Sequence, residues 1–373
     1  MIAQSGRGRT IFLCGDVMTG RGVDQILPHP GDPTLREPMA DDARSYVRYA
    51  EETSGPIPRP VDFAWPWGEA LALVDHFAPD LRLINLETTI TADGELAHGK
   101  SVHYRMHPDN MTCLTAMRPD VCVLANNHIL DFGQRGLIDT LEALNRAEIA
   151  HVGAGLDSDH AERPAIVTLS DGHHVVIASG ATESSGIPRG WAATAARAGV
   201  AFIPNLLNRT ATEMTDRVLA LKQPGDITIV SLHWGSNWDY DVARSQVRFA
   251  RRLIDAGVDV VHGHSSHHPR PIEVYRGKLI LYGCGDAIND YEGIKGFEAY
   301  RNELRLLYFA SIEPDTGNLT TLHMTPMRAR RMRLDHASHQ DSEWLRSTLE
   351  RISRRFGTYV TLDHDANLIV HGS

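Results

Sequence analysis

The sequence has little of what several special classes of protein require. Only four of its 373 residues are cysteines, none of them in Cys-x-x-Cys spacing. We therefore predict buried, reduced thiols and no disulfide framework. Aromatic residues make up only 7% of the chain, and the composition is that of an ordinary globular protein. No apolar run approaches the ~20 residues of a membrane helix, which excludes a helical membrane span.

Basic residues are also in the minority. The chain has 37 lysines and arginines against 47 aspartates and glutamates, a net charge of −10. Because a duplex-binding protein usually has the opposite sign, we expect no nucleic-acid partner. The polar start of the chain, with an apolar run only at residues 11–14, lacks the ~7–15-residue apolar region of a signal peptide. We expect a cytoplasmic protein without a membrane partner, and the sequence leaves its oligomeric state open.

What the chain does have is a regular alternation of short apolar runs and amphipathic segments. Strands are expected at residues 11–14, 81–85, 121–125, 165–169, 175–179, 227–232, 258–262, 279–282 and 304–312. Helices are expected at residues 67–76, 111–117, 134–147, 211–222, 245–256 and 344–356. This alternation predicts an α/β layered fold.

One long segment between the expected strands is rich in proline. Residues 28–66 contain eight prolines, with a helical piece expected near residues 41–52. Long loops in compact domains are often lids or binding loops, although a surface excursion without a role is the plainer alternative. We predict a lid that overhangs the functional site, with Trp65 and Trp67 partly facing it.

The end of the chain is rich in arginine. Eight arginines lie beyond residue 327, in a segment expected to form a helix and a hairpin that turns at residues 363–367. We treat residues 1–327 as the catalytic domain and residues 328–373 as a basic segment packed on it. A solvated basic face is one interpretation. The other is a docking surface for an acidic or carboxylate-bearing substrate, which Arg330, Arg331 and Arg333 would attract.

Histidine is unusually frequent, with 20 residues. Many of them lie in short polar motifs that follow the expected strands. Five such motifs follow apolar runs: CGDVM at residues 14–18, NLE at 85–87, NNHILDFG at 126–133, HWG at 233–235 and HGHSSHHP at 262–269. The carboxyl ends of strands in an open α/β sheet form a binding crevice. Because carboxylate, amide and imidazole groups are the ligands of catalytic divalent metals, we predict a metal or acid/base site there.

The chain resembles the CapA-type poly-γ-glutamate synthesis family of calcineurin-like metallophosphoesterases in the order of GDVMTGR, NLE, ANNHILDFG, HWG, GHSSHHP and YGCGDAINDY. The resemblance covers about residues 10–312 and implies a four-layer α/β/β/α sandwich. It makes His128 the catalytic histidine, with Asp131 to orient it. It implies a metal shell formed by Asp16, Glu87, Asn127, His233, His264 and His267.

The chain also departs from this family's pattern. Many metallophosphoesterases begin with Asp-x-His, whereas Met18 stands at the third position here, and a thioether is a poor ligand for a hard cation. We therefore expect one metal position to be better occupied than the other. The metal could be Mn, Zn, Fe, Mg or Ca. Ser265 and Ser266 replace a histidine and a proline, and Asp286 adds a carboxylate near the rim.

Three reactions are compatible with a metal and a mobile histidine. The favoured one is inversion at a peptide α-carbon, because members of this fold occur as epimerases in lasso-peptide maturation. It needs a base on one face, His128, and an acid on the other, for which His267 or His268 is expected. Phosphoester hydrolysis and amide chemistry on a poly-γ-glutamate polymer are the alternatives. Contacts to the peptide substrate are expected from Arg21, Trp65, Asn126, Trp234 and Asp286.

Overall fold

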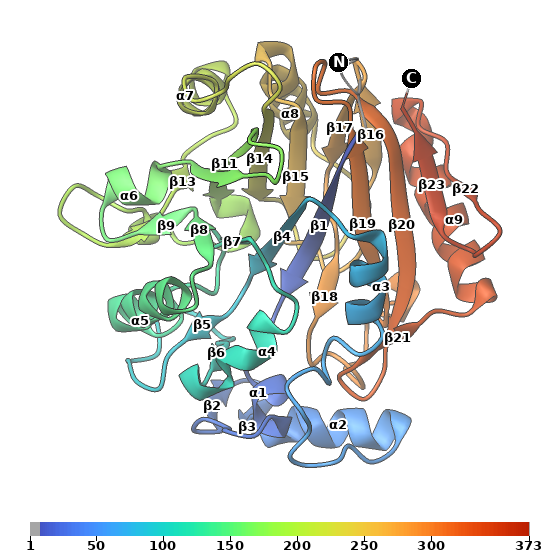
Figure 1. Cartoon of the computed structure of the whole chain (residues 1–373). Helices are drawn as coiled ribbons and strands as arrows, with labels where there is room; N and C mark the ends of the chain where they lie inside the picture. The colour runs from blue at the N-terminus through green and yellow to red at the C-terminus, as the bar shows by residue number, and fades with distance from the viewer. Residues whose placement is uncertain (1–7, 373) are drawn as a thin grey trace.

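A computed structural model of the chain describes residues 8–372. Most of the segment on which the absence of a signal peptide was argued, residues 1–7, lies outside the described residues. Two large sheets, one of ten strands and one of seven, stand side by side in the centre of Figure 1. Both ends of the described chain lie at one end of these sheets, and α2 (Arg44–Ser54) lies at the other.

The two sheets contain most of the strands, and their central strands are parallel. The first sheet has β1 (Arg9–Val17), β4 (Leu81–Leu86), β7 (Val121–Val123), β8 (Ala150–Val152), β18 (Asp286–Ile288), β19 (Leu304–Ile312), β20 (Leu319–Ala329), β21 (Leu334–His336), β22 (Thr361–Leu362) and β23 (Leu368–His371). The second has β10 (Ala165–Thr168), β11 (His174–Thr182), β13 (Phe202–Ile203), β14 (Ile227–His233), β15 (Val260–His264), β16 (Ile272–Tyr275) and β17 (Lys278–Leu281). Because β1, β4 and β7 run parallel, as do β11, β14 and β15, each sheet gathers several carboxyl ends at one edge.

Helices and small strand pairs complete the fold. The helices are α1 (Gly22–Ile26), α2, α3 (Ala70–Phe77), α4 (Met111–Thr115), α5 (Gly133–Arg146), α6 (Ser158–Glu162), α7 (Asn208–Leu219), α8 (Arg244–Ala256) and α9 (His339–Ser353). The small pairs join β2 (Thr34–Glu37) to β3 (Ala40–Asp42), β5 (Thr89–Ile90) to β6 (Arg105–Met106), and β9 (Ala154–Gly155) to β12 (Gly199–Val200). Single 3₁₀ turns lie at Pro108–Asn110, Glu183–Ser185, Arg189–Trp191, Glu298–Tyr300 and Arg354–Phe356.

Three apolar cores separate four layers. Along β1, Ile11 and Leu13 pack into a core that also contains Val260 of the second sheet, whereas Phe12 belongs to the core under Leu137 of α5. This alternation is the period of two that a strand gives its side chains. The third core lies on the far face of the second sheet, against α7 and α8. The order helix, sheet, sheet, helix confirms the predicted α/β/β/α sandwich.

The sequence located most elements but missed one long strand. Each of the nine expected strands and six expected helices has a counterpart in the structure. The missed strand is β20, which pairs with β19 along most of its length. The expected boundary after residue 327 falls inside β20, and β23 pairs with β20. The arginine-rich segment thus continues the first sheet, and the domain division stays a prediction.

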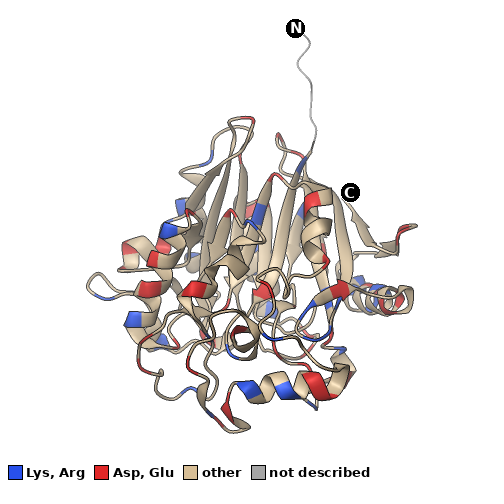
Figure 2. Cartoon of the chain, turned by 60° about the horizontal axis from the view of Figure 1, so that its bottom comes forward, with Lys and Arg blue, Asp and Glu red and all other residues tan. Residues whose placement is uncertain are grey.

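The cysteines behave as expected. All four are free thiols and buried, and burial raises the pKa of the Cys122 thiol. None of the helices within residues 8–372 combines the length and the apolar character that crossing a bilayer would require. Acidic and basic residues are interspersed along the helices and loops that face the viewer in Figure 2.

The proline-rich segment lies at the end to which β1 runs, but Trp67 does not face the site. Trp67 is fully buried, and its Nε1 donates a hydrogen bond to the Cys113 carbonyl, 2.8 Å away. Trp65 donates from Nε1 to the Arg331 carbonyl at 3.0 Å. The prediction that Trp67 partly faces the site is wrong because the residue is fully buried, whereas Trp65 is half-buried and its role as a substrate contact stays a prediction.

Candidate metal centre and acid/base site

The site begins where β1 ends. Asp16 pairs in register with Asn85 of β4 on one side and with Asp286 of β18 on the other. Position 15 must be glycine for β18 to pair this closely with β1, because a Cβ at Gly15 would lie 1.7 Å from the Gly285 carbonyl oxygen. Asn85 donates from Nδ2 to Asp16 Oδ1 at 2.7 Å and so orients the carboxylate. The backbone therefore sets two carboxylates, on Asp16 and Asp286, beside one another.

A first group of metal donors joins the two sheets. Asp16, His233 and His264 are buried, and each offers a ligand atom within 4.8 Å of the others. His233 Nδ1 lies 2.8 Å from His264 Nδ1, and the latter lies 3.8 Å from Asp16 Oδ1. The remaining nitrogen of His264 contacts Ser231 Oγ at 2.9 Å, an outer hydrogen bond that fixes the ring.

A second donor group shares Asp16. It adds His267 and Asp286, again with ligand atoms within 4.8 Å of one another. His267 Nδ1 lies 3.0 Å from Asp286 Oδ1. Met18 offers no hard donor, and its sulfur lies 3.8 Å from the Tyr291 hydroxyl. We expected this position to lack a ligand because Met18 is a poor one. It nevertheless has three donors, because Asp286 supplies a carboxylate.

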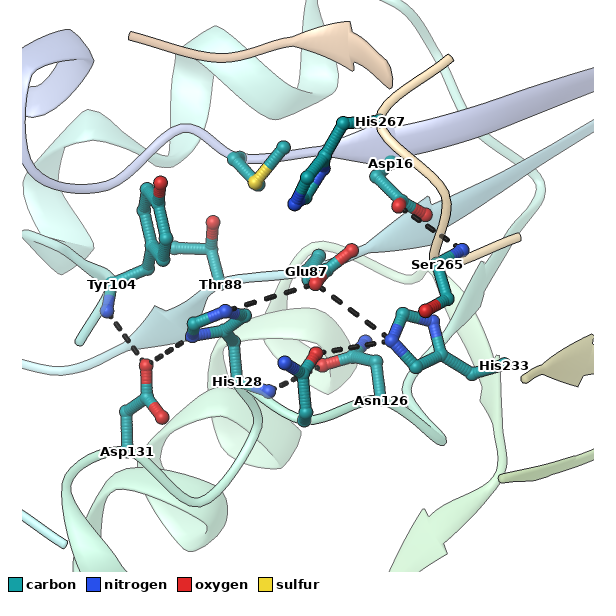
Figure 3. A network of polar contacts seen from close by, with 12 residues as sticks. Asp16, Glu87, Thr88, Tyr104, Asn126, His128, Asp131, His233, Ser265 and His267 are labelled. Atoms are coloured by element: carbon teal, nitrogen blue, oxygen red, sulfur yellow. Dashed lines mark hydrogen bonds and ion pairs between the residues drawn. The ribbon is translucent and has the colours of Figure 1, made fainter. Parts of the chain in front are cut away.

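Glu87 and Asn127 lie beside the first group. Figure 3 shows Glu87 between His128 and His233, and its Oε1 is 3.8 Å from Nε2 of each. Asn127 Oδ1 lies 3.0 Å from His233 Nε2. The six predicted metal ligands are therefore brought to one rim, with Asp286 as a seventh donor. Their role as ligands stays a prediction.

The electrostatics of the rim fit a divalent cation. Burial and the Asp286 charge raise the pKa of Asp16 to about 7, and burial with the Asp16 charge raises the pKa of Glu87 well above its usual value. Burial also lowers the pKa of His233 and of His264, which leaves both imidazoles in the neutral form that binds metals. A cation would relieve the repulsion between the carboxylates, and the mixed oxygen and nitrogen donors suit several metals.

His128 stands next to these groups as an acid/base candidate. Its Nδ1 lies 2.6 Å from Asp131 Oδ2, which also accepts a hydrogen bond from the Tyr104 amide at 2.7 Å. Burial lowers the pKa of His128 to about 4, against the opposing effect of Asp131. Because Nδ1 is held by Asp131, Nε2 is the nitrogen that faces Glu87 (Figure 3). The resemblance implied this contact between His128 and Asp131, and the catalytic role of His128 stays a prediction.

Lys100 is a residue of the site that sequence reasoning missed. Its Nζ lies 3.0 Å from His128 Nδ1 and donates hydrogen bonds to Asp131 Oδ1 and to the Asn127 carbonyl. Burial lowers the pKa of Lys100, although Asp131 opposes the shift. Lys100 lies between β5 and β6, in a segment without apolar periodicity, so sequence reasoning had no signal for it.

Two other expected site residues are structural. Trp234 is fully buried, and its Nε1 donates to the Tyr282 carbonyl at 3.1 Å. His268 packs against Trp238, and its Nε2 accepts a hydrogen bond from the Asp239 amide at 3.2 Å. Trp234 as a substrate contact and His268 as an acid are therefore wrong, because neither side chain has a free group at the rim.

Asn126 and Arg21 also have structural tasks. Asn126 donates from Nδ2 to the Leu86 carbonyl at 2.8 Å and accepts a hydrogen bond from the His128 amide, so it braces the turn that carries His128. Arg21 pairs with Glu37 and Asp290 and is 4% exposed. Neither offers a free polar group to a substrate, which corrects their assignment as substrate contacts. Among the five expected contacts, Asp286 has its side chain in the second donor group.

Known proteins were compared with the chain. A family profile described as "Bacterial capsule synthesis protein PGA_cap" matches residues 10–291. A protein of Mycobacterium tuberculosis named as a probable polyglutamine synthesis accessory protein is 61% identical over 357 residues, which cover 95% of this chain and 94% of that one. The PGA biosynthesis protein CapA of Bacillus subtilis is 29% identical over 284 residues, 74% of this chain and 62% of that one.

Among solved structures, a 5'-nucleotidase precursor from Thermus thermophilus is similar with a TM-score of 0.45 and 14% identity, over 86% of this chain and 54% of that one. The profile match extends from β1 to Tyr291 and contains all the metal donors and the His128 dyad. The chain belongs to the PGA_cap family of bacterial capsule synthesis proteins.

Proposed function

We propose that this protein is a metal-dependent enzyme that acts on a carboxylate-bearing glutamyl chain, and that cleavage of an amide bond is its reaction. The observation that carries the proposal is the His128–Asp131 pair, adjacent to two donor groups that share Asp16. The names of the relatives, which refer to polyglutamine and PGA synthesis, supply the substrate class.

The residues of the chain have distinct tasks in this reaction. A divalent metal held by Asp16, His233 and His264, and by His267 and Asp286, would polarise the amide carbonyl and lower the pKa of water. His128, which is neutral at rest, takes a proton from the attacking water at Nε2 and passes it to the leaving nitrogen as the carbon–nitrogen bond breaks. Water supplies the hydroxyl that the carbonyl carbon gains, so the products are a carboxylate and an amine. Asp131 holds the ring and stabilises its cation.

A polar cavity supports a substrate that carries carboxylates. It measures 560 Å³ and lies against Lys100, with Arg36, His98, His103 and Arg105 among its lining residues. His103 is 3% exposed, and its Nδ1 has no hydrogen-bond partner among the described residues. Arginine pairs with carboxylates in a bidentate way, so Arg36 and Arg105 are suited to the side chains of a glutamyl chain.

Inversion at a peptide α-carbon is the second candidate. Figure 3 shows His128 and His267 on opposite sides of Glu87. Burial by itself would lower the pKa of His267, but the charge and hydrogen bond of Asp286 and the charge of Asp16 together raise it, whereas the pKa of His128 is lowered to about 4. A neutral base that faces a protonated acid is the arrangement inversion needs. It would require His267 to act as an acid and not as a ligand.

One experiment separates these reactions. The metal-loaded protein is incubated in deuterated water with poly-γ-glutamate oligomers, an α-linked glutamyl peptide and a nitrophenyl phosphodiester. Cleavage predicts new amines without deuterium at any α-carbon. Inversion predicts one deuteron at the inverted carbon and no new amine. Release of nitrophenol at enzymatic rates without a change in either glutamyl substrate would replace both candidates by phosphoester hydrolysis.

His128→Asn and Asp16→Asn provide the controls. His128→Asn is expected to bind metal and to lose about 10²–10⁴-fold in kcat. Asp16→Asn is expected to lose metal and activity together, because Asp16 belongs to both donor groups. Full turnover in His128→Asn would contradict the assigned proton donor.

A further inference from the structure

A second cavity lies away from the His128 rim, between the end of α2 and the arginine-rich segment. It measures 210 Å³. Its lining includes Ser54, Asn302, Arg305, Arg328 and Arg330. It therefore joins the proline-rich segment to the consecutive strands β19 and β20, which are distant from that segment in sequence. The proposed reaction uses none of these side chains.

Arg305 is the unusual member of this lining. It belongs to β19 and is only 2% exposed. Burial lowers the pKa of Arg305 although the charges of Asp286 and Glu303 oppose the shift, and within residues 8–372 its Nε has no hydrogen-bond partner. Its Nη2 donates to Asn289 Oδ1 at 2.9 Å, and Nη1 donates to the carbonyls of Asn302 and Leu304. A buried charge without a counter-ion is costly, so this guanidinium favours an anion beside it.

Two further arginines stand at the cavity's exposed side. Arg328 and Arg330 follow one another on the same face at the end of β20 and beyond it, and both are exposed. Arg328 reaches Asp341 only at 3.7 Å, with a side chain 48% exposed. Both guanidinium groups therefore remain accessible to a ligand from solvent.

The acidic residues of the lining do not cancel these charges. Glu303 pairs with Arg301, with 2.7 Å between Oε1 and Nε. Glu292 accepts a hydrogen bond from the Met332 amide, and burial raises its pKa. Three arginines thus face one carboxylate that is paired elsewhere and one whose charge is disfavoured. The cavity has an excess of positive charge in a protein with a net charge of −10.

We propose that this cavity binds a small oxyanion, either a carboxylate or a phosphate group, between the buried guanidinium of Arg305 and the exposed guanidinium groups of Arg328 and Arg330. Hydrogen bonds from charged donors to such an anion are about twice as strong as neutral ones. Ser54 and Asn302 add neutral polar groups to the same lining.

The cavity is also connected to the metal donors. Arg305 holds Asn289, whose Nδ2 donates to Asp286 Oδ2 at 2.6 Å, and Asp286 in turn holds His267. An anion against Arg305 therefore lies one hydrogen-bonded residue away from a metal donor.

The test is calorimetric titration of the metal-loaded protein, in chloride-free buffer, with inorganic phosphate in one arm and glutarate in the other. Arg330→Glu reverses an exposed charge at the cavity without touching the core. Arg354→Glu is the matched control, because Arg354 is exposed on the same segment and only 3.6 Å from Glu350 in a surface pair. Asp16→Asn removes the metal centre, which could itself bind phosphate.

The expected result is saturable binding that Arg330→Glu weakens about tenfold or more and that Arg354→Glu and Asp16→Asn leave within about twofold. Tighter binding of phosphate would identify a phosphoryl ligand, and tighter binding of glutarate a carboxylate ligand. The absence of saturable heat with both anions would overturn the proposal. So would binding that Asp16→Asn abolishes and Arg330→Glu preserves, since it would place the anion at the metal centre. No outcome depends on turnover, so the proposed reaction is tested separately.

Discussion

At the scale of single residues, Lys100 affects both the position and the pKa of His128, the proposed catalytic histidine. Its ammonium shares Asp131 with His128 and lies 3.0 Å from His128 Nδ1. The ammonium charge also lowers the pKa of His128, a smaller effect than burial. Lys100 is therefore a positioning residue, since it acts through His128 and Asp131.

Lys100→Met is expected to lower kcat with little change in KM and to move the acidic limb of the pH–rate profile to higher pH. The direction follows because the loss of the ammonium charge makes the His128 cation easier to form. Lys222→Met is the matched control, since Lys222 also pairs with a buried aspartate, Asp259. Identical pH profiles for the wild type and Lys100→Met would show that Lys100 only stabilises the loop.

Metal binding should strengthen as pH rises from about 6 to 8. Asp16, with a pKa of about 7, and His267, with a raised pKa, must lose protons to become ligands. His233 and His264 are already neutral in this range because their pKa values are lowered. Titration with Mn²⁺ at several pH values, with proton release measured in buffers of different ionisation enthalpy, checks this. An affinity independent of pH over that range would contradict it.

Asp286 decides whether the second donor group binds metal. Asp286→Asn removes a carboxylate from one group only, so metal content is expected to fall from two ions per chain to one. His268→Phe is the control and should leave metal content unchanged, because His268 packs among aromatic rings. Elemental analysis of the purified proteins measures both. If the wild type and Asp286→Asn both contain one ion per chain, the second donor group does not bind metal.

At the scale of elements, the sequence was informative wherever a strand ends. A parallel strand must present the residue after its last buried position at the sheet's edge, so Asp16, His233 and His264 could be located from apolar runs alone. The direction of a side chain beyond that edge depends on neighbours distant in sequence. His268 was misassigned for this reason, since Trp238 and Tyr300 stack on its ring.

β20 was missed for a different reason. Its sequence alternates apolar and polar residues weakly and contains Pro326, which normally argues against a central strand. In the structure Pro326 pairs in register with Leu306 of β19, and the strand continues to Ala329. The pairing partners of β20 are non-local, and composition cannot reveal them.

A buried ion pair between Arg21 and Glu37 holds the proline-rich segment against the residues that follow β1. Arg21 Nη1 lies 2.9 Å from Glu37 Oε2, and its guanidinium lies 3.6 Å from the centre of the Tyr46 ring in α2. Glu37→Leu should cost about 3–5 kcal/mol of unfolding free energy, because it leaves a buried charge without one partner. Hydrogen exchange of the α2 amides is expected to accelerate more than that of β1.

Glu52→Leu is the control for that experiment. Glu52 forms a surface pair with Arg48 at 3.9 Å, and its side chain is 67% exposed, so a change of about 0–1 kcal/mol is expected. Equal exchange rates in α2 for both variants would mean that the Arg21–Glu37 pair does not hold the segment in place.

At the scale of the whole molecule, the candidate metal centre bridges the two sheets. Asp16 comes from β1 of the first sheet, whereas His233 and His264 come from β14 and β15 of the second. Their separation is set by the core between the sheets, where Leu83 and Ile229 pack. Because donors from both sheets must meet, a metal that binds the folded chain stabilises the sandwich as a unit.

Removal of the metal should therefore lower the Tm of the entire protein in one transition. At a free metal concentration of 100 times Kd, binding contributes about 2.7 kcal/mol to unfolding free energy, and EDTA removes that contribution. Differential scanning calorimetry with and without EDTA measures the shift. The Asp16→Asn protein should show no shift, because both donor groups lose their shared carboxylate. An EDTA shift that persists in Asp16→Asn would place the stabilising metal elsewhere, and two separate transitions in the metal-free protein would show that the sheets fold independently of the centre that joins them.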